Sequence, residues 1–255
     1  MQMQQKGLSR DAIKYAAMIT MLLNHIANVF LSPESFLAQI FLDAGYFTAP
    51  IMCFFLVEGF YRTHSRRNYA ARLAVFSVIS ELPYCLAFSG AWSEDTILVF
   101  CGMNMMFTLL LCFGILEVLH TQRNALVRTA LIAGLTVLSL FSDWALLAPC
   151  YTLLFAWARG SREREKQAFS IAAVVFAAFS FSGNIGQFSA GLSLLYAFGA
   201  AAGVAAAGVV ILFAYNGRRA ERGRTFSKWF FYWFYPAHLL LLGVIRVCAI
   251  GIRNI

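Results

Sequence analysis

The chain has 255 residues, of which 60% are hydrophobic and 13% charged, and its formal net charge is +8. A soluble domain normally has about a quarter of its residues charged and under half apolar, so this composition excludes an ordinary soluble protein and indicates a lipid environment. The positive charge does not indicate nucleic-acid binding, because the basic residues lie in short clusters between apolar runs, as they do at the ends of membrane spans.

The apolar runs predict an all-α, polytopic transmembrane bundle of about nine spans, since about 20 helical residues cross the hydrocarbon core. The fifth and sixth spans are short and are separated only by Ser142 and Asp143, so they form a tight hairpin or a re-entrant pair. We expect a single membrane domain over residues 1–255. In chain order, the expected spans are residues 12–31, 38–60, 70–88, 97–119, 125–141, 144–158, 168–184, 191–214 and 228–249.

The first apolar run follows a basic segment, as the apolar part of a signal peptide does. It contains Asn24 and His25, however, and no small-residue cleavage site follows it. We therefore expect an uncleaved first span.

Basic residues occupy alternate connections between the spans. Eighteen of the 20 lysines and arginines lie in the N-terminal segment and within residues 62–72, 123–128, 159–166 and 218–228, and the connections between these have none. Only Arg246 and Arg253 lie on the other side. Because cytoplasmic loops are enriched in Lys and Arg, the pattern predicts a bacterial inner-membrane protein with its N-terminus in the cytoplasm and its C-terminus outside.

His25 lies in the middle of the first span, where an ionisable side chain is costly and is a functional candidate by default. Asn24 and Asn28 lie on neighbouring parts of the same helical face. A histidine beside amides can act as a general base with its tautomer fixed by hydrogen bonding. The alternative is an interhelical hydrogen-bond cluster that only holds the bundle together.

Glu81 lies in the third span, and Ser77 and Tyr84 are four and three residues away from it, which places a polar stripe on one helical face. A buried carboxylate can orient a histidine, act as an acid or base, or pair with an arginine. The alternative is a purely structural ion pair.

The fourth and last spans each contribute a further polar candidate. His238 follows Pro236 by two residues, and the proline removes a backbone donor and so exposes polar backbone beside the histidine. Asn104 and Thr108 are four residues apart in the fourth span.

Four arginines follow the second span. Arg62 is four residues after Glu58, a spacing that allows an ion pair on one helix. Arg66, Arg67 and Arg72 complete a patch whose forked donors suit phosphate. The alternative is a cytoplasmic loop whose basic residues serve only to orient the protein.

The six cysteines lie in or beside apolar runs without the close spacing of metal ligands. Free cysteine behaves as a small hydrophobic residue in such surroundings. We therefore expect no metal site and no disulfide framework.

Five segments together carry a family resemblance: ITMLLNHIANVF, FFLVEGFYRTHSRRNYAARL, ISELPYCLAF, NMMFTLLL and FYWFYPAHLLLL, in this order. With them the chain resembles the TraX family of integral membrane proteins, which includes the conjugative-plasmid protein that N-acetylates pilin. The resemblance runs from about residue 11 to residue 246, and residues 120–225 match mainly in hydropathy. The chain departs from the family pattern at Asn24, where the pattern has Asp before the histidine, and at Cys85, where a polar residue is typical.

The resemblance implies an acyltransferase that uses acetyl-CoA as its donor. The acceptor is expected to be an amine, such as the N-terminus of pilin or of another peptide, or a hydroxyl, with glycan and lipid acceptors also open. The chain is also similar, more distantly, to multi-span acyltransferases that use a histidine in an early span. The residues expected to bind the phosphates of acetyl-CoA are Arg62, Arg66, Arg67 and Arg72.

On this hypothesis His25 deprotonates the acceptor, and Asn28 and a carboxylate, from Glu81 or Asp43, orient it. Asn104 or His238 donates to the developing oxyanion, and the roles of the two histidines can be exchanged. Two rival classes stay open, a proton-coupled transporter and a non-catalytic membrane assembly factor, because buried His, Glu and Asp also form proton relays.

Overall fold

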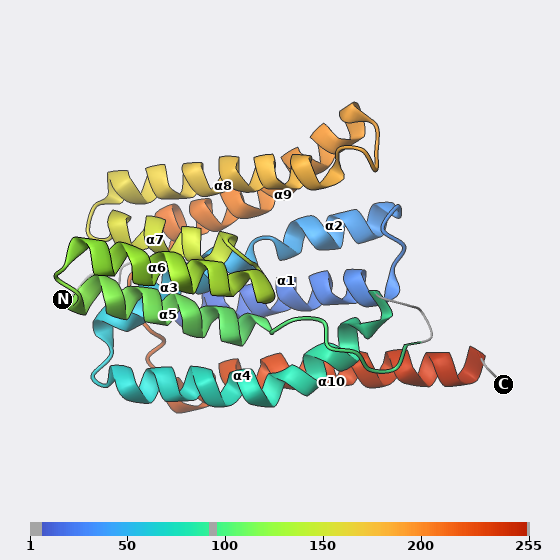
Figure 1. Cartoon of the computed structure of the whole chain (residues 1–255), viewed down its shortest axis with the longest axis horizontal. Helices are drawn as coiled ribbons and strands as arrows, with labels where there is room; N and C mark the ends of the chain where they lie inside the picture. Colours follow the sequence, from blue (N-terminus) through green and yellow to red (C-terminus); the bar gives the residue numbers. More distant parts are fainter. Residues whose placement is uncertain (1–6, 92–95, 254–255) are drawn as a thin grey trace.

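A computed structural model describes residues 7–91 and 96–253, and in these ranges every regular element is helical (Figure 1). Lys6 and residues 92–95, on which part of the expected charge pattern rests, lie outside the described residues. The elements in chain order are α1 (Arg10–Phe30), α2 (Phe36–Gly45), α3 (Thr48–Arg62), α4 (Arg66–Phe88), η1 (Ser89–Ala91), α5 (Met105–Thr121), α6 (Ala125–Leu138), η2 (Ser139–Phe141), α7 (Leu147–Ala158), α8 (Arg162–Asn184), α9 (Ala190–Val209), η3 (Val210–Ala214) and α10 (Arg224–Arg253).

Several of these helices have the length and composition of membrane spans, which confirms the predicted class of a multi-pass helical membrane protein. The five that are long and apolar enough to cross a bilayer are Phe36–Arg62, Arg66–Phe88, Arg162–Asn184, Ala190–Ala214 and Arg224–Ile252. The apolar segments Met105–Thr121, Ala125–Phe141 and Leu147–Ala158 are shorter.

Polar side chains that satisfy the first backbone amides begin most of the helices. Each accepts a hydrogen bond from a backbone N–H two or three residues further on, a contact that typically stabilises a helix by about 1 kcal/mol. These capping residues are Ser9, Ser35, Ser65, Asn104, Asn124, Ser161 and Ser189.

The expected second span is broken into two helices at Tyr46 and Phe47. The cause lies in Pro50, in the first turn of α3, because a proline lacks the N–H donor and its ring clashes with the carbonyl four residues earlier. That carbonyl belongs to Tyr46. α2 and α3 therefore follow one another as two helices in place of the single continuous one that the sequence predicted.

The expected fourth span is shorter than predicted, since residues 97–104 are not helical and α5 begins at Met105. This segment pairs with the turn before α7: the Met103 N–H donates to the Phe141 carbonyl at 2.8 Å, and the Asp143 N–H donates to the Met103 carbonyl at 2.8 Å. Gly102, with a φ of +93°, makes the approach possible because it has no side chain. The two irregular segments satisfy one another's backbone groups, as non-helical chain in a membrane protein must.

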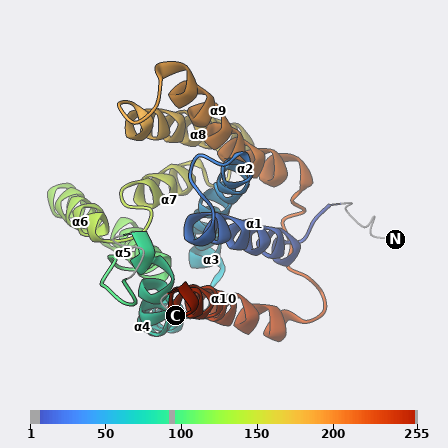
Figure 2. The ribbon, with the colours of Figure 1, turned by 90° about the vertical axis from the view of Figure 1, so that its right-hand side faces the viewer.

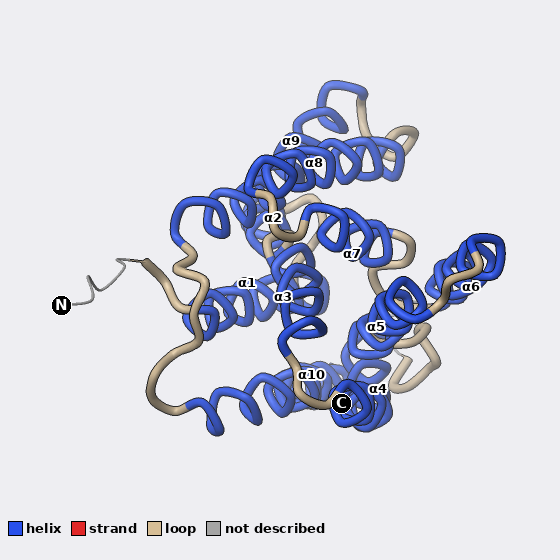
Figure 3. The backbone as a smooth tube through the Cα atoms, turned by 90° about the vertical axis from the view of Figure 1, so that its left-hand side faces the viewer, coloured by secondary structure: helices blue, strands red, loops and turns tan. Residues whose placement is uncertain are grey.

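The helices run roughly along one axis of the bundle (Figure 1). α1 and α3 lie in its middle, with α4 and α10 packed together on one side and α8 and α9 on the other (Figures 2 and 3). α6 lies at the edge, and none of residues 125–138 is buried. The central position of α1 and α3 explains why their inward faces line the interior cavity.

A candidate active site in the bundle interior

A cavity of about 370 Å³ enters the bundle between α1, α3, α4, α5 and α10. Its lining changes in character along α1, from basic residues near Arg10 through methionines to polar residues at Asn24 and His25. Arg10 and His25 are 15 residues apart, which corresponds to about 22 Å along a helix. The cavity therefore connects a basic mouth with a polar interior.

Six cationic side chains surround the mouth, and Asp11 is the acidic residue among them. The Asp11 carboxylate accepts a hydrogen bond from the Ala220 N–H at 2.9 Å. The Nε atom of Arg10 is buried without a hydrogen-bond partner among the described residues, and an unpaired buried donor is costly unless a ligand satisfies it. The cationic residues are Arg10, Lys14, Arg62, Arg72, Arg219 and Lys228.

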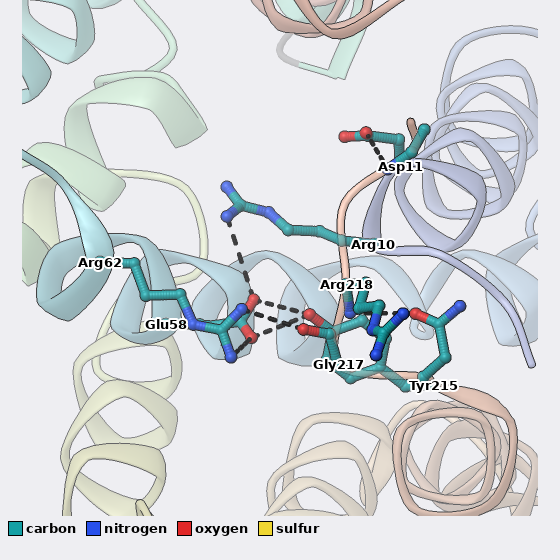
Figure 4. Close-up of polar contacts among 9 residues, drawn as sticks. Arg10, Asp11, Glu58, Arg62, Tyr215, Gly217 and Arg218 are labelled. Carbon is teal, nitrogen blue, oxygen red and sulfur yellow. Dashed lines mark hydrogen bonds and ion pairs between the residues drawn. The ribbon is translucent and has the colours of Figure 1, made fainter. Parts of the chain in front are cut away.

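Glu58, in the last turns of α3, holds this end of the bundle together (Figure 4). Its carboxylate pairs with Arg62 at 3.1 Å and with Arg10 at 3.9 Å, and it accepts hydrogen bonds of 2.8 and 3.0 Å from the Tyr215 hydroxyl. Arg62 also donates to the Gly217 carbonyl at 3.0 Å. The expected pair of Glu58 and Arg62 thus forms part of a larger network that joins α1, α3 and the connection before α10.

Two of the four arginines expected to bind phosphate line the cavity, and two do not. Arg62 and Arg72 belong to its lining. Arg66 instead lies 3.8 Å from Glu117 and stacks over the Phe60 ring, and Arg67 is exposed outside the lining. Consecutive arginines at the start of α4 cannot share one helical face, which is why the structure separates them.

The middle of the cavity is lined by methionines. Their unbranched side chains adapt to irregular shapes and present little polarity, so this stretch suits a flexible and mostly apolar ligand. The methionines are Met18, Met21, Met52, Met105 and Met106.

At the inner end, α1 and α10 bring His25 and His238 together. His25 is 7% exposed and His238 is 6% exposed. Nδ1 of His25 lies 2.8 Å from Nε2 of His238, and the planes of the two rings are within 7° of parallel. Nδ1 of His238 lies 2.7 Å from the Phe234 carbonyl oxygen.

These contacts determine which ring nitrogens carry hydrogens when both imidazoles are neutral. A carbonyl oxygen only accepts, so Nδ1 of His238 is the donor and its Nε2 is an acceptor. Nδ1 of His25 must then donate to His238. The remaining nitrogen, Nε2 of His25, carries a lone pair and forms no hydrogen bond with a described residue.

Glu81 and Asn104 are also brought together, but they do not line the cavity and form no hydrogen bond with the histidines. The Asn104 side-chain amide donates to Glu81 at 2.6 Å and to the Ser77 carbonyl at 2.7 Å, and the Asn104 backbone N–H donates to Glu81 at 3.2 Å. Asn104 begins α5 as its capping residue. The pair therefore fixes the start of α5, and both hydrogens of the Asn104 amide are already used.

Two other expected partners of His25 lie elsewhere. Asn28 is exposed, and its amide donates to Asn24 at 2.8 and 2.9 Å. Asp43 accepts a hydrogen bond from Gln39 at 2.8 Å. The hydrogen-bond partner of His25 is thus His238, and not Asn28 or a carboxylate as the sequence led us to expect.

Sequence reasoning missed Tyr235 and Asp143, which both line the inner end of the cavity. Tyr235 is 4% exposed, its ring centre is 6.4 Å from that of His25, and its hydroxyl accepts from the Met105 N–H at 3.1 Å. Its position three residues before His238 was the available signal, since that spacing places both on one helical face. For Asp143 the signal was a lone acidic residue between two short apolar runs.

Comparisons with known proteins found a matching family and a curated relative. A profile of the family described as TraX protein matches residues 9–246. The chain is 30% identical over 232 residues to the "Probable fimbrial assembly protein FimC, serogroup H1" of Dichelobacter nodosus, with 90% of this chain and 92% of that protein covered. No solved structure matched the chain.

Proposed function

The chain belongs to the TraX family, and from that premise we propose that it is an inner-membrane acetyltransferase that moves acetyl from acetyl-CoA to the amine of a pilin or another peptide. The main support for the proposal is the cavity, which has a basic mouth, a middle lined by methionines, and His25 hydrogen-bonded to His238 at its inner end. A phosphate-rich donor with a long flexible arm has the matching order of chemical groups.

The proposed topology has nine spans, with the N-terminus in the cytoplasm and the C-terminus outside. In support of it, side-chain and backbone contacts link the basic segments at one end of the bundle. Arg10 donates from its backbone to Arg218, Arg159 stacks over Tyr61 at 3.9 Å, and Arg66 pairs with Glu117. Acetyl-CoA, made in the cytoplasm, would then meet the basic mouth directly.

The phosphates of acetyl-CoA bind at the mouth, where arginine offers forked donors and lysine a compact charge. Arg72 and Arg219 are the two arginines of the mouth that form no ion pair with a described residue. The pantetheine arm follows the methionines inward. The thioester then lies beside His25 without the whole donor crossing the membrane.

Nε2 of His25 acts as the general base. It takes a proton from the amine as the nitrogen attacks the thioester carbon, and then gives it to the leaving thiolate. His238 acts as a positioning residue that fixes the tautomer of His25, a role that a neighbouring carboxylate often has. The Tyr235 hydroxyl accepts a hydrogen bond from Met105 and so has its own hydrogen free to donate to the oxyanion.

The acceptor class rests on the relatives. The curated relative is called a probable fimbrial assembly protein. The family resemblance adds pilin N-acetylation, which is transfer to an amine. An amine on a pilin or another peptide is therefore the acceptor that we propose.

Calorimetric titration of acetyl-CoA into the purified protein in detergent tests the donor assignment. Wild type is expected to bind in the micromolar range, and the double change Arg72→Ala/Arg219→Ala to weaken binding at least tenfold, since each charge-assisted hydrogen bond contributes about 1.5–3 kcal/mol. Arg67→Ala is the matched control, because it removes one arginine close in sequence that lies outside the cavity.

His25→Ala separates binding from chemistry. The variant is expected to bind acetyl-CoA within about twofold of wild type, and to lose release of free CoA in the presence of a peptide amine by at least 100-fold, the lower range for a general base. Folded wild-type protein that does not bind acetyl-CoA would overturn the donor assignment and favour transport or assembly.

A further inference from the structure

Asp143 lies at the inner end of the cavity on a segment that several contacts hold in place. Its backbone N–H donates to Met103 at 2.8 Å, and its carbonyl accepts from the Thr108 hydroxyl at 2.6 Å. The next residues, Trp144 and Leu146, have φ values of 56° and 60°, a conformation that side chains other than glycine rarely adopt. Such strain is kept where the surroundings enforce it, often at functional sites.

A chain of contacts connects Asp143 with the histidines. Met103, its backbone partner, is two residues before Met105, whose N–H donates to the Tyr235 hydroxyl at 3.1 Å. The Tyr235 ring in turn lies 6.4 Å from the His25 ring, centre to centre. Asp143 and His25 thus belong to the same end of one cavity.

The Asp143 carboxylate has no cationic partner. It takes part in none of the ion pairs found among residues 7–91 and 96–253, and no side chain there donates a hydrogen bond to it. The cationic residues of the cavity line its other end, where Lys14 is 11 residues before His25, or about 16 Å along α1. The Trp144 backbone N–H donates to the carboxylate, which leaves its charge without a cation to balance it. A buried carboxylate in this position at a cavity favours a cationic ligand.

We propose that Asp143 is the acceptor-binding residue of this protein, and that its carboxylate receives a primary amine as the ammonium ion. This inference rests on the proposed function, whose acceptor is an amine, and it names the residue that binds that amine. A hydroxyl acceptor is neutral and would form only a hydrogen bond with the carboxylate, without the ion pair that an ammonium ion adds. Burial raises the pKa of the Asp143 carboxyl to about 6, so the group is still ionised at neutral pH and also able to accept a proton.

The proposal gives each proton a destination. Asp143 takes the first proton of the ammonium ion, which leaves a neutral amine with a lone pair. The nitrogen then forms a bond to the acetyl carbon, and the bond between that carbon and the sulfur of CoA breaks. His25 takes the second proton and passes it to the sulfur, so the products are the acetylated amine, free CoA and one proton that Asp143 returns to water.

Binding of two fluorescent hexapeptides tests the proposal without relying on turnover. They share one sequence that begins with alanine and carry the dye at the C-terminus, and one has a free amine while the other is N-acetylated. Wild-type protein in detergent at pH 7.5 is expected to bind the free amine at least tenfold more tightly. Asp143→Asn is expected to bind both peptides equally, and Asp143→Glu to keep part of the preference.

Two results would overturn the proposal: wild type that lacks the preference, including wild type that binds neither peptide, and Asp143→Asn that keeps it. Binding of the N-acetylated peptide with wild-type affinity shows that the Asn variant is folded. Calorimetry with acetyl-CoA on the same samples separates the two proposals. In one outcome, wild type fails to bind acetyl-CoA and still prefers the free amine, with the preference absent in Asp143→Asn. That result would support the acceptor site and overturn the donor assignment.

Discussion

At the scale of single residues, the hydrogen bond between His25 and His238 decides which atom can act as a base. Nδ1 of His238 is held by the Phe234 carbonyl at 2.7 Å, so the His25 side chain must donate from its own Nδ1 at 2.8 Å. Only Nε2 of His25 then has a lone pair available. The sequence left the roles of the two histidines open, and the geometry favours His25 as the base.

Replacing His238 tests whether His25 is the base and His238 only positions it. His238→Ala is expected to lower kcat for acetyl transfer about 10–100-fold, the usual cost of losing an orienting partner, with KM for acetyl-CoA unchanged. His238→Gln should recover much of the rate, because an amide oxygen can accept from His25. A Gln variant as slow as the Ala variant would contradict the positioning role.

We expect the titration of Asp143 to determine how amine binding depends on pH. With a raised pKa of about 6, the carboxylate is protonated below that pH and charged above it. The preference for the free amine over the acetylated peptide should therefore grow as pH rises through about 6, and be largely lost at pH 5. Tyr84 of α4 and Tyr235 of α10 are titratable side chains close to Asp143, and both also lie near Glu81.

The comparison with Asp143→Asn isolates this group from others in the cavity. Unperturbed tyrosines titrate near pH 10 and do not change charge in this range, whereas histidines do. Both proteins contain His25 and His238, so subtracting the pH profile of the amine preference in Asp143→Asn from that in wild type removes the contribution of these histidines. A pH-dependent preference that persists in the Asn variant would assign it to the histidines instead.

At the scale of helices, α2 and α9 are in backbone contact through small residues. A Cβ atom at Gly199 would overlap the Asp43 carboxylate, and one at Gly203 would overlap the Asp43 backbone carbonyl. Small residues four apart let membrane helices approach in this way. This contact fixes α2, and through it the outer half of the second span, against the α8 and α9 pair.

Gly203→Ala is expected to destabilise the protein by about 1–3 kcal/mol, the usual cost of overpacking a tight contact. Gly191→Ala, in the same helix, is the control, because a Cβ atom there meets nothing within 4 Å. Thermal unfolding in detergent should give a lower Tm for the first variant alone. Equal Tm values would mean that the two helices separate easily.

At the scale of the whole molecule, the bundle has a charged end and an apolar body. The segments that carry arginine and lysine meet at one end, where Glu58 joins α1, α3 and the connection before α10. The side chains on the outside of the bundle are largely apolar, including Val78 of α4, Val174 of α8 and Phe213 of η3. An apolar outer surface is typical of a protein immersed in lipid, and the proposed topology places the basic end in the cytoplasm.

Fusions to alkaline phosphatase test the proposed topology. The enzyme needs disulfides and is active only outside the cytoplasm. A fusion after residue 253 is expected to be active, and one after Gly160, between α7 and α8, to be inactive. Activity in the second fusion and not in the first would mean that the orientation is the reverse of the proposed one. Equal activity in both would contradict an odd number of spans between the two fusion points.

The class of protein and most of its helices could be predicted from the sequence alone, because hydropathy and capping residues act locally. It could not predict where α5 begins, because this depends on contacts between distant segments: Met103 pairs with Phe141, and α5 starts where Glu81 holds Asn104. The family resemblance was likewise available from the sequence, through segments such as SELP and FYPAHLL.

Only the tertiary structure decided which polar residues share a site. His25 and His238 are 213 residues apart, and nothing local distinguishes a pairing between them from the expected pairing of His25 with Asn28 or Glu81. The same holds for the basic mouth, where Arg10, Arg72 and Arg219 come from three separate segments. Helix packing places side chains relative to one another across the bundle, and it is set by the shape of whole helix faces, which no short segment of sequence contains.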